Sequence, residues 1–511
     1  MREKHVVVVG AGMAGLVSAL LLAHQGVQVT VVDKATTVGG KIRQLPIHGH
    51  GVDSGPTVFT MRWVFDEIFS TVNASLDQLL KIAPLPVLAR HAWDDGSRLD
   101  LFADPAASVD AIGRFAGAAE AKNFERFCIK VREVYDTLQA PYIQSNAPSM
   151  LQLMGALGPK GLGVLASLGT MSSLWDSLGR FFNDVRLRQL FARYATYCGS
   201  SPWQAPATLM LIAQVEMDGV WAIEGGMHAL PLCLETLAKQ RGAHFILGQA
   251  CQQINTHAGQ VNGVTLENGQ TIQADAVVFN GDIAALQTGL LGNTVMRATK
   301  PASVERSLSA VTWSMHAKTQ GFALDRHNVF FQNHYASEFD DIFKKQQLPL
   351  TPTVYVCAQD RGLDGTPSLE GERLLCLVNA PAVGDKNLLT DEAIEQCQHN
   401  SFQLLKRCGL EIQTSTTNTL RTTPATFHQL FPATGGALYG QATHGWMSAF
   451  SRPTAKSQIP GLFLAGGSVH PGPGVPMAAM SGRLAGAAVM AHLNSISRSS
   501  RVATSGGMLT H

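Results

Sequence analysis

The segment from residue 5 to residue 33 constrains the fold more than any other part of the chain. It contains a β-branched run (HVVVV), a glycine turn, an apolar stretch and a second β-branched run (VQVTVVD), which is the pattern of a βαβ unit. The turn carries Gly10, Gly12 and Gly15 in the spacing G-x-G-x-x-G. In this context the three glycines permit a tight turn, close approach of a pyrophosphate and close packing of helix on strand. The segment predicts a Rossmann-like α/β domain with a dinucleotide site.

Four neighbouring residues belong to the same predicted site. Met13 and Ala14 lie at the start of the helix, where N–H groups and the positive end of the dipole favour a phosphate. Asp33 ends the second strand, where a carboxylate accepts hydrogen bonds from the adenosine ribose hydroxyls. Lys34 follows it. We therefore assign all four to cofactor binding.

A second glycine pattern favours FAD over NAD. VGGK comes directly after the second strand, and DSGPT forms a turn shortly afterwards. Paired glycines allow the backbone to approach the phosphates, and a cation beside them balances the pyrophosphate charge. The cofactor residues predicted in these turns are Gly39, Gly40, Lys41, Gly55, Pro56 and Thr57. No second G-x-G-x-x-G follows a strand, so we expect no NAD(P) domain and predict that oxygen or a quinone accepts the electrons.

The closing segment, residues 460–476, contains an apolar strand, a Gly/Pro loop and the start of a helix. A helix that begins near Val475 would direct its N-terminal dipole at the flavin and stabilise the anionic reduced ring. His470, in the loop, is a candidate base, although a loop histidine can equally hydrogen-bond the backbone. The predicted cofactor residues here are Gly466, Gly467, Val475, Pro476 and Met477.

Similar α/β patterns recur far apart along the chain, which predicts a discontinuous domain. We expect an α/β fold with a Rossmann-like FAD-binding domain, a substrate-binding sheet lobe formed by runs such as AVTWSMHAK, TVYVCAQ and RLLCLVNA, and a helical region. The predicted boundaries are 1–104, 220–300 and 452–495 for the FAD domain, 105–219 for the helical region, 301–451 for the sheet lobe and 496–511 for a mobile tail.

Composition excludes several classes of protein. The 511 residues carry 39 Lys+Arg and 38 Asp+Glu, a net charge of +1, without a basic cluster, so no nucleic-acid partner is expected. The eight cysteines lack zinc spacing, so no metal is expected. No signal peptide or spanning segment is recognised. Residues 137–175 contain a single charge, Lys160, and form either a buried helix pair or an exposed apolar face.

Several stretches together resemble the bacterial carotenoid desaturases of the phytoene desaturase family. They are VVVVGAGMAGL, VGGKIR, DSGPTVFTM, LRQLF, GVWAIEGGMHAL and GLFLAGGSVHPGPGVPMAAMSGR. The details GPTVFTMRWVFDEIF and AGGSVHPGPGVPMAAMSG are most similar to the branch that introduces a C3–C4 double bond into acyclic 1-hydroxy or 1-methoxy carotenoids. The sequence departs from the family at Asp33, where Glu is usual, and at Lys41, where Arg is common. Both departures keep the sign of the charge.

The resemblance implies an FAD-dependent oxidoreductase that transfers a hydride from an acyclic carotenoid to flavin as a proton is lost. It also implies peripheral association with the bacterial inner or photosynthetic membrane from the cytoplasmic side. Asp184 and Arg188, in NDVRLRQLF, are candidate polar groups near the substrate, with a surface pair of charges four residues apart as the alternative. Phytoene or C30 diapophytoene desaturation, amine oxidation and a non-catalytic lipid-escort role on the same fold remain open.

Overall fold

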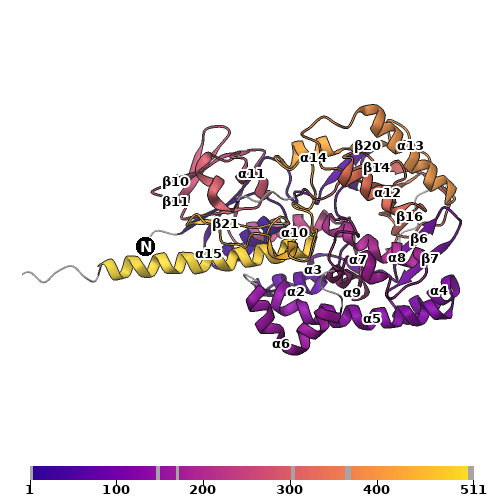
Figure 1. The fold of residues 1–511 in the computed structure, drawn as a ribbon. Coiled ribbons are helices and arrows are strands. Elements are labelled where there is room, and N and C mark those ends of the chain that lie inside the picture. The colour runs from indigo at the N-terminus through magenta and orange to yellow at the C-terminus, as the bar shows by residue number, and fades with distance from the viewer. Residues whose placement is uncertain (1–3, 146–149, 168–171, 301–304, 363–369, 505–511) are drawn as a thin grey trace, which may run out of the picture.

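A five-stranded parallel sheet forms the core of one half of the molecule, the half that contains α10 (Ala229–Gln240) and α15 (Val475–Thr504) (Figure 1). The computed structural model describes residues 4–145, 150–167, 172–300, 305–362 and 370–504. In spatial order the strands are β21 (Leu462–Leu464), β13 (Ala276–Phe279), β1 (His5–Val9), β2 (Gln28–Asp33) and β9 (His244–Leu247). The sheet is therefore assembled from segments far apart in the sequence, as the discontinuous α/β fold predicts.

Helix α1 (Met13–His24) covers one face of this sheet and is buried along almost its whole length. It packs against α10 and α15. The contact with α15 is tight, because a Cβ at Gly482 would lie 2.3 Å from the Ala14 carbonyl oxygen. Ser18 donates a hydrogen bond to the Gly482 carbonyl at 2.8 Å. The opposite face packs against a smaller antiparallel sheet, β10 (Cys251–His257), β11 (Gln260–Leu266) and β12 (Thr271–Gln273).

A seven-stranded sheet forms the second half of the molecule. Its order is β20 (Thr419–Thr422), β14 (Ser309–Ala317), β18 (Glu372–Ala380), β17 (Val354–Ala358), β16 (His327–Phe331), β6 (Val87–Trp93) and β7 (Arg98–Phe102). The three runs predicted as strands of a sheet lobe form its neighbouring strands β14, β18 and β17. The structure differs at residues 87–102, which the predicted boundaries group with the FAD domain. Here β6 pairs in parallel with β16, so β6 and β7 extend the second sheet.

A helical region lies along the lower side of the molecule in Figure 1, and its helix α4 (Pro105–Ala116) packs against β7 of the seven-stranded sheet. The helices that follow are α5 (Ala118–Leu138), α6 (Met150–Ser167), α7 (Leu174–Leu178), α8 (Val185–Ala192) and α9 (Leu211–Met217), with the short helices η2 (Arg193–Cys198) and η3 (Ala207–Met210). The backbone of α6 is kinked at Gly158, directly before Pro159. In the apolar stretch 137–175, Leu153 and Val164 are buried and Met154 is 44% exposed, so it has both a buried and an exposed side. Residues 146–149 and 168–171 of the stretch lie outside the described residues.

The predicted start of the C-terminal tail falls within a helix. A mobile tail is predicted from residue 496, yet α15 continues to Thr504. The segment NSISRSSRVAT contains no proline or glycine, so nothing stops propagation of a helix that packing has already nucleated. Residues 505–511 lie outside the described residues.

Candidate active site

One large cavity, about 1500 Å³, lies where the two halves and the helical region meet. The predicted cofactor residues gather along one part of its wall, although they come from both ends of the chain. Those that line the cavity are Gly10, Gly12, Met13, Ala14, Asp33, Lys34, Gly39, Gly40, Lys41, Gly55, Pro56, Thr57, Gly466, Gly467, Val475, Pro476 and Met477. Gly15 is behind the wall.

The two N-terminal glycine turns form a single cradle. Gly39 donates a backbone hydrogen bond to the Ala11 carbonyl at 2.9 Å. A Cβ at Gly40 would lie 3.1 Å from the Cα atom of Gly12, and a Cβ at Gly12 would lie 2.9 Å from the Asn280 amide oxygen. Because Gly12 and Gly40 have no side chains, backbone atoms line the cavity at these two positions. This cradle fits the pyrophosphate of FAD, which needs close approach to backbone N–H groups.

Behind the cradle, Gly15 and Asn280 connect the first turn to the closing segment. A Cβ at Gly15 would lie 2.0 Å from the Gly10 carbonyl oxygen, so only glycine lets α1 pack here. The Gly15 N–H donates to the Asn280 amide oxygen at 2.9 Å, and the Asn280 amide nitrogen donates to the Ala465 carbonyl at 3.1 Å. Sequence reasoning missed Asn280, which directly follows the apolar strand β13 and lies beside the first glycine turn.

The Asp33 carboxylate is fixed at the end of β2. One oxygen accepts from the Ala11 N–H at 2.6 Å and the other from the Ala35 N–H at 2.8 Å. The side chain is partly exposed and lines the cavity, so it retains lone pairs that can accept further hydrogen bonds. Its predicted role toward ribose hydroxyls is compatible with this geometry.

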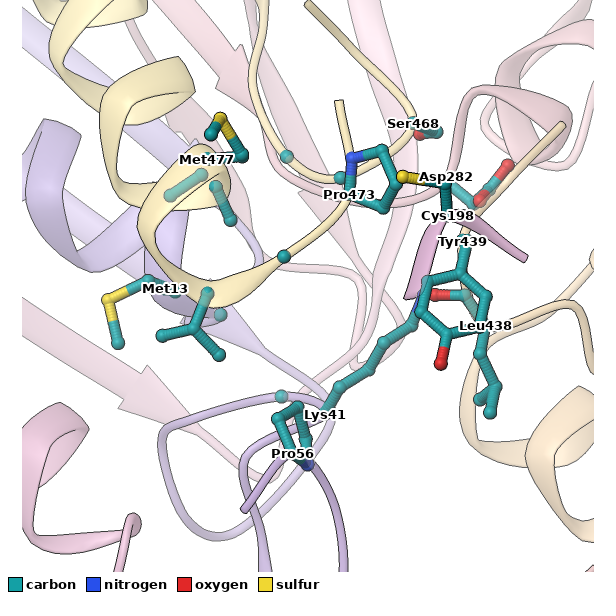
Figure 2. A pocket seen from close by; sticks show the side chains of 18 of the residues that line it. Met13, Lys41, Pro56, Cys198, Asp282, Leu438, Tyr439, Ser468, Pro473 and Met477 are labelled. Atoms are coloured by element: carbon teal, nitrogen blue, oxygen red, sulfur yellow. The ribbon is translucent and has the colours of Figure 1, made fainter. Parts of the chain in front are cut away.

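Lys41 points away from the glycine cradle, toward the second half of the molecule. Its ammonium donates a hydrogen bond to the Leu438 carbonyl, and Figure 2 shows the side chain reaching toward Leu438 and Tyr439. Burial lowers the pKa of Lys41, and the charge of Asp282 opposes that shift. Its predicted role beside the pyrophosphate stays a prediction; in the structure the ammonium joins two cavity walls.

The turn at residues 53–57 is packed too tightly for larger residues. A Cβ at Gly55 would lie 1.9 Å from the Lys41 carbonyl oxygen. Asp53 is buried and accepts from the Met227 N–H at 2.6 Å, which anchors the turn to the segment before α10. Burial raises the pKa of Asp53, and the hydrogen bonds it accepts oppose the shift. The turn thus holds Thr57 at the cavity wall.

The start of α15 and the loop before it form the wall beside the first turn. Val475, Pro476 and Met477 line the cavity at the N-terminus of this long helix. Arg452, a residue that sequence reasoning missed, braces the loop. Its guanidinium donates to the Gly467 carbonyl at 3.0 Å and to the Gln441 carbonyl at 2.9 Å. Burial lowers the pKa of Arg452. This arrangement fits an anionic reduced flavin near the helix N-terminus.

The three candidate catalytic residues, Asp184, Arg188 and His470, do not line the cavity. Asp184 is the N-cap of α8, and its carboxylate accepts a hydrogen bond from the Arg186 backbone N–H. The same carboxylate forms an ion pair with the Arg186 guanidinium at 2.6 Å, and not the predicted pair with Arg188. Arg188 lies over the Trp175 ring, with its guanidinium carbon 4.6 Å from the ring centroid. His470 contacts the Ser145 carbonyl through Nε2 at 2.9 Å, and burial lowers its pKa to about 4. All three have structural contacts instead.

Beyond the cofactor loops the cavity becomes a mainly apolar chamber. Side chains of α5, α6, η3 and α9 line one side, and inward-facing residues of β17 and β18 line the other. The apolar lining residues include Leu138, Leu153, Met154, Leu157, Leu162, Leu209, Leu211, Ile212, Val215, Leu375 and Leu377. A group of polar residues interrupts this lining near Thr57; it consists of Arg193, Tyr197, Glu216 and Tyr355.

The Rossmann-like sheet, the glycine cradle and the helix N-terminus define a flavin-dependent oxidoreductase. Residues 13–490 match the family of flavin containing amine oxidoreductases, and the chain belongs to this family. The predicted α/β FAD-binding fold and the FAD cofactor are thereby confirmed. A solved oxidoreductase from Methanosarcina mazei shares the fold, with a TM-score of 0.62 and 16% identity over 94% of this chain and 99% of that one.

Within that family the chain is similar to enzymes named as carotenoid desaturases. It is 58% identical to the hydroxyneurosporene desaturase of Rubrivivax gelatinosus, over 100% of this chain and 98% of that protein. The hydroxyneurosporene desaturase of Cereibacter sphaeroides is 44% identical over 96% and 99% of the two chains. The 1-hydroxycarotenoid 3,4-desaturase of a Flavobacterium is 29% identical over 94% and 98%. The resemblance to carotenoid desaturases is confirmed.

Proposed function

We propose that this chain is an FAD-dependent desaturase that introduces a C3–C4 double bond into acyclic 1-hydroxy or 1-methoxy carotenoids. The observation that carries the proposal is the continuity of the cavity from the cofactor cradle into the apolar chamber. Its volume of about 1500 Å³ exceeds the roughly 300–1,000 Å³ of a pocket for one small molecule. A cofactor and a long apolar chain can therefore occupy it together. The names of the relatives support the same reaction.

The chain's own contribution to the reaction is positioning. Bound FAD supplies a hydride acceptor. The hydrogens at C4 of the substrate are allylic to the polyene, so positive charge that develops at this carbon spreads along the conjugated chain. Lining residues such as Thr57, Tyr439 and Val475 would position C3 and C4 of the substrate, and orientation of this kind lowers a barrier substantially. A strongly basic side chain is not required for the proton to leave.

We also propose that the enzyme works at the surface of the bacterial inner or photosynthetic membrane, from the cytoplasmic side. Met154 is 44% exposed and Trp446 is 50% exposed, and both line the cavity. They place apolar surface where the chamber meets the exterior, which suits uptake of a polyene that is dissolved in lipid. Among the described residues, no helix is long and apolar enough to cross a membrane.

Oxygen or a quinone is the proposed electron acceptor. The sequence contains one G-x-G-x-x-G that follows a strand, and this copy forms the cradle described above. A quinone would reach the flavin from the same lipid phase as the substrate.

Anaerobic turnover tests the proposed reaction. Liposomes containing either a 1-hydroxy acyclic carotenoid or phytoene are mixed with the flavin-loaded protein, and flavin bleaching and the polyene spectrum are recorded. We expect bleaching and a red-shifted polyene with the hydroxylated carotenoid alone. Turnover of phytoene would assign the chain to another desaturase branch. Absence of bleaching with both, in protein that retains FAD and bleaches with an amine, would contradict desaturation.

A further inference from the structure

A charged side chain stands in the apolar chamber. Arg193 begins η2, directly after α8, and its guanidinium lies between two tyrosine rings. The guanidinium carbon is 5.3 Å from the ring centroids of both Tyr197 and Tyr355. Its Nη1 donates to the Tyr197 hydroxyl at 3.1 Å. Arg193 is deep inside the protein but keeps accessible surface, because it lines the cavity.

Among the described residues, Tyr197 is the one hydrogen-bond partner of this guanidinium, so most of its donors have no protein acceptor. An arginine side chain has five N–H donors and no acceptor. The hydrogen bond to the Tyr197 hydroxyl uses one of these donors. Within the described residues Arg193 forms no ion pair shorter than 4.0 Å. Burial lowers the pKa of Arg193, but Tyr197, Tyr355 and Glu216 outweigh that effect and raise it, so the group is charged. A charged donor that faces a cavity needs an acceptor.

The position of Arg193 is set relative to the cofactor. The Tyr355 hydroxyl lies 2.8 Å from the Thr57 hydroxyl and 2.7 Å from Nδ1 of His327. Thr57 belongs to the turn that forms the cofactor wall. In a 1-hydroxy or 1-methoxy carotenoid the oxygen at C1 lies within about 5 Å of C3 and C4, since each bond spans about 1.5 Å. A group that binds this oxygen must therefore adjoin the cofactor wall, as Arg193 does.

We propose that Arg193 donates hydrogen bonds to the oxygen at C1 of the substrate and thereby selects carotenoids that are oxygenated at C1. The proposal rests on the proposed function. A side chain that only donates binds a hydroxyl or a methoxyl oxygen equally well. A hydrocarbon end group would displace water from the guanidinium and offer no acceptor, which disfavours its entry. Arg193 acts as a positioning residue, with Tyr197 and Tyr355 holding its plane.

Turnover of a 1-hydroxy carotenoid gives the first readout. In Arg193→Leu we expect kcat/KM to fall about 10- to 100-fold, the range for loss of a hydrogen bond to a charged group, and in Arg193→Lys to fall less, because a donor remains. The matched control is Arg186→Leu, which removes an arginine that pairs with Asp184 outside the cavity and should change kcat/KM less than about 3-fold. FAD content and melting temperature verify that each variant is folded.

Equilibrium binding gives a second readout that needs no turnover. Quenching of tryptophan fluorescence is measured with the 3,4-desaturated 1-hydroxy product and with a hydrocarbon of equal conjugation. We expect the wild type to prefer the oxygenated polyene and Arg193→Leu to bind both alike. That result without any wild-type turnover would support the subsite and contradict the proposed function. Wild-type turnover together with an unchanged preference in folded Arg193→Leu would overturn the subsite and leave the proposed function standing.

Discussion

Asn280 shows how much one residue contributes to the cofactor site. Its amide accepts from the Gly15 N–H and donates to the Ala465 carbonyl, so it joins the first glycine turn to the closing segment. In Asn280→Ala both backbone groups lose their partner, which costs about 1–3 kcal/mol each when buried. We expect a lower melting temperature and weaker FAD affinity, measured by differential scanning calorimetry and by FAD titration of the flavin-free protein.

Asn255 provides the matched control for this prediction. It lies on β10, hydrogen-bonds Thr265 within one partly exposed sheet and does not line the cavity. Asn255→Ala should leave FAD affinity unchanged and lower stability slightly. An equal loss of FAD affinity in the two variants would show that Asn280 has no special role in shaping the cradle.

For single residues, the sequence predicts where the backbone requires glycine better than it predicts what a polar side chain contacts. The spacing of Gly10, Gly12 and Gly15 identifies the cradle, because only glycine satisfies its close contacts and the requirement is local. Arg193 and Arg452 carry no such signature. Their roles depend on which surface the packing of distant elements turns them toward, and the residues around them in the sequence do not specify that.

Among the elements, helix α15 completes the cofactor site through one close contact. A Cβ at Gly482 would lie 2.3 Å from the Ala14 carbonyl, whereas a Cβ at Gly486 would lie 4.0 Å from its nearest neighbour, the Cβ atom of Leu21. Gly482→Ala should destabilise the protein by about 1–3 kcal/mol and weaken FAD binding, because the start of α15 moves with the helix. Gly486→Ala, on the same helix, should be neutral or slightly stabilising. Denaturant unfolding and FAD titration compare the two, and equal stability of both variants would contradict the packing argument.

Sequence patterns predict single strands but not which distant strands pair with each other. Alternating apolar runs predict β14, β17 and β18, since each run carries its own periodicity. The place of β6 in the same sheet depends on parallel pairing with β16, more than two hundred residues away. No pattern within either strand specifies such a partner, so the predicted boundary at residue 104 and the structure differ there.

For the whole molecule, the proposed membrane contact leads to a prediction about substrate delivery. The double variant Met154→Asp, Trp446→Asp places charge where the chamber meets the exterior, and a charge is costly to bring into lipid. We expect weaker flotation with liposomes and slower turnover of liposome-borne carotenoid. Turnover of the same carotenoid in detergent should change little, because the interior of the chamber is unaltered.

Ile129 offers a control of the same chemistry on another surface. It lies on α5, is 72% exposed and does not line the cavity. Ile129→Asp should leave flotation and turnover unchanged. If it weakens flotation as much as the double variant does, membrane contact is not centred on the mouth of the chamber.

The discontinuous sheet also bears on how the protein is made. Strand β1 ends at Val9, but β21 begins at Leu462 and α15 at Val475. At the usual 5–20 residues per second, the ribosome needs about 20 to 90 seconds to synthesise the chain between β1 and β21. During that time β13 lacks its outer neighbour β21, and α1 lacks α15, against which it packs. The apolar surface left uncovered is of the kind that chaperones bind. FAD can meet a finished site only after the ribosome has reached the start of α15, so the cofactor binds after both glycine turns and the whole seven-stranded sheet have been synthesised.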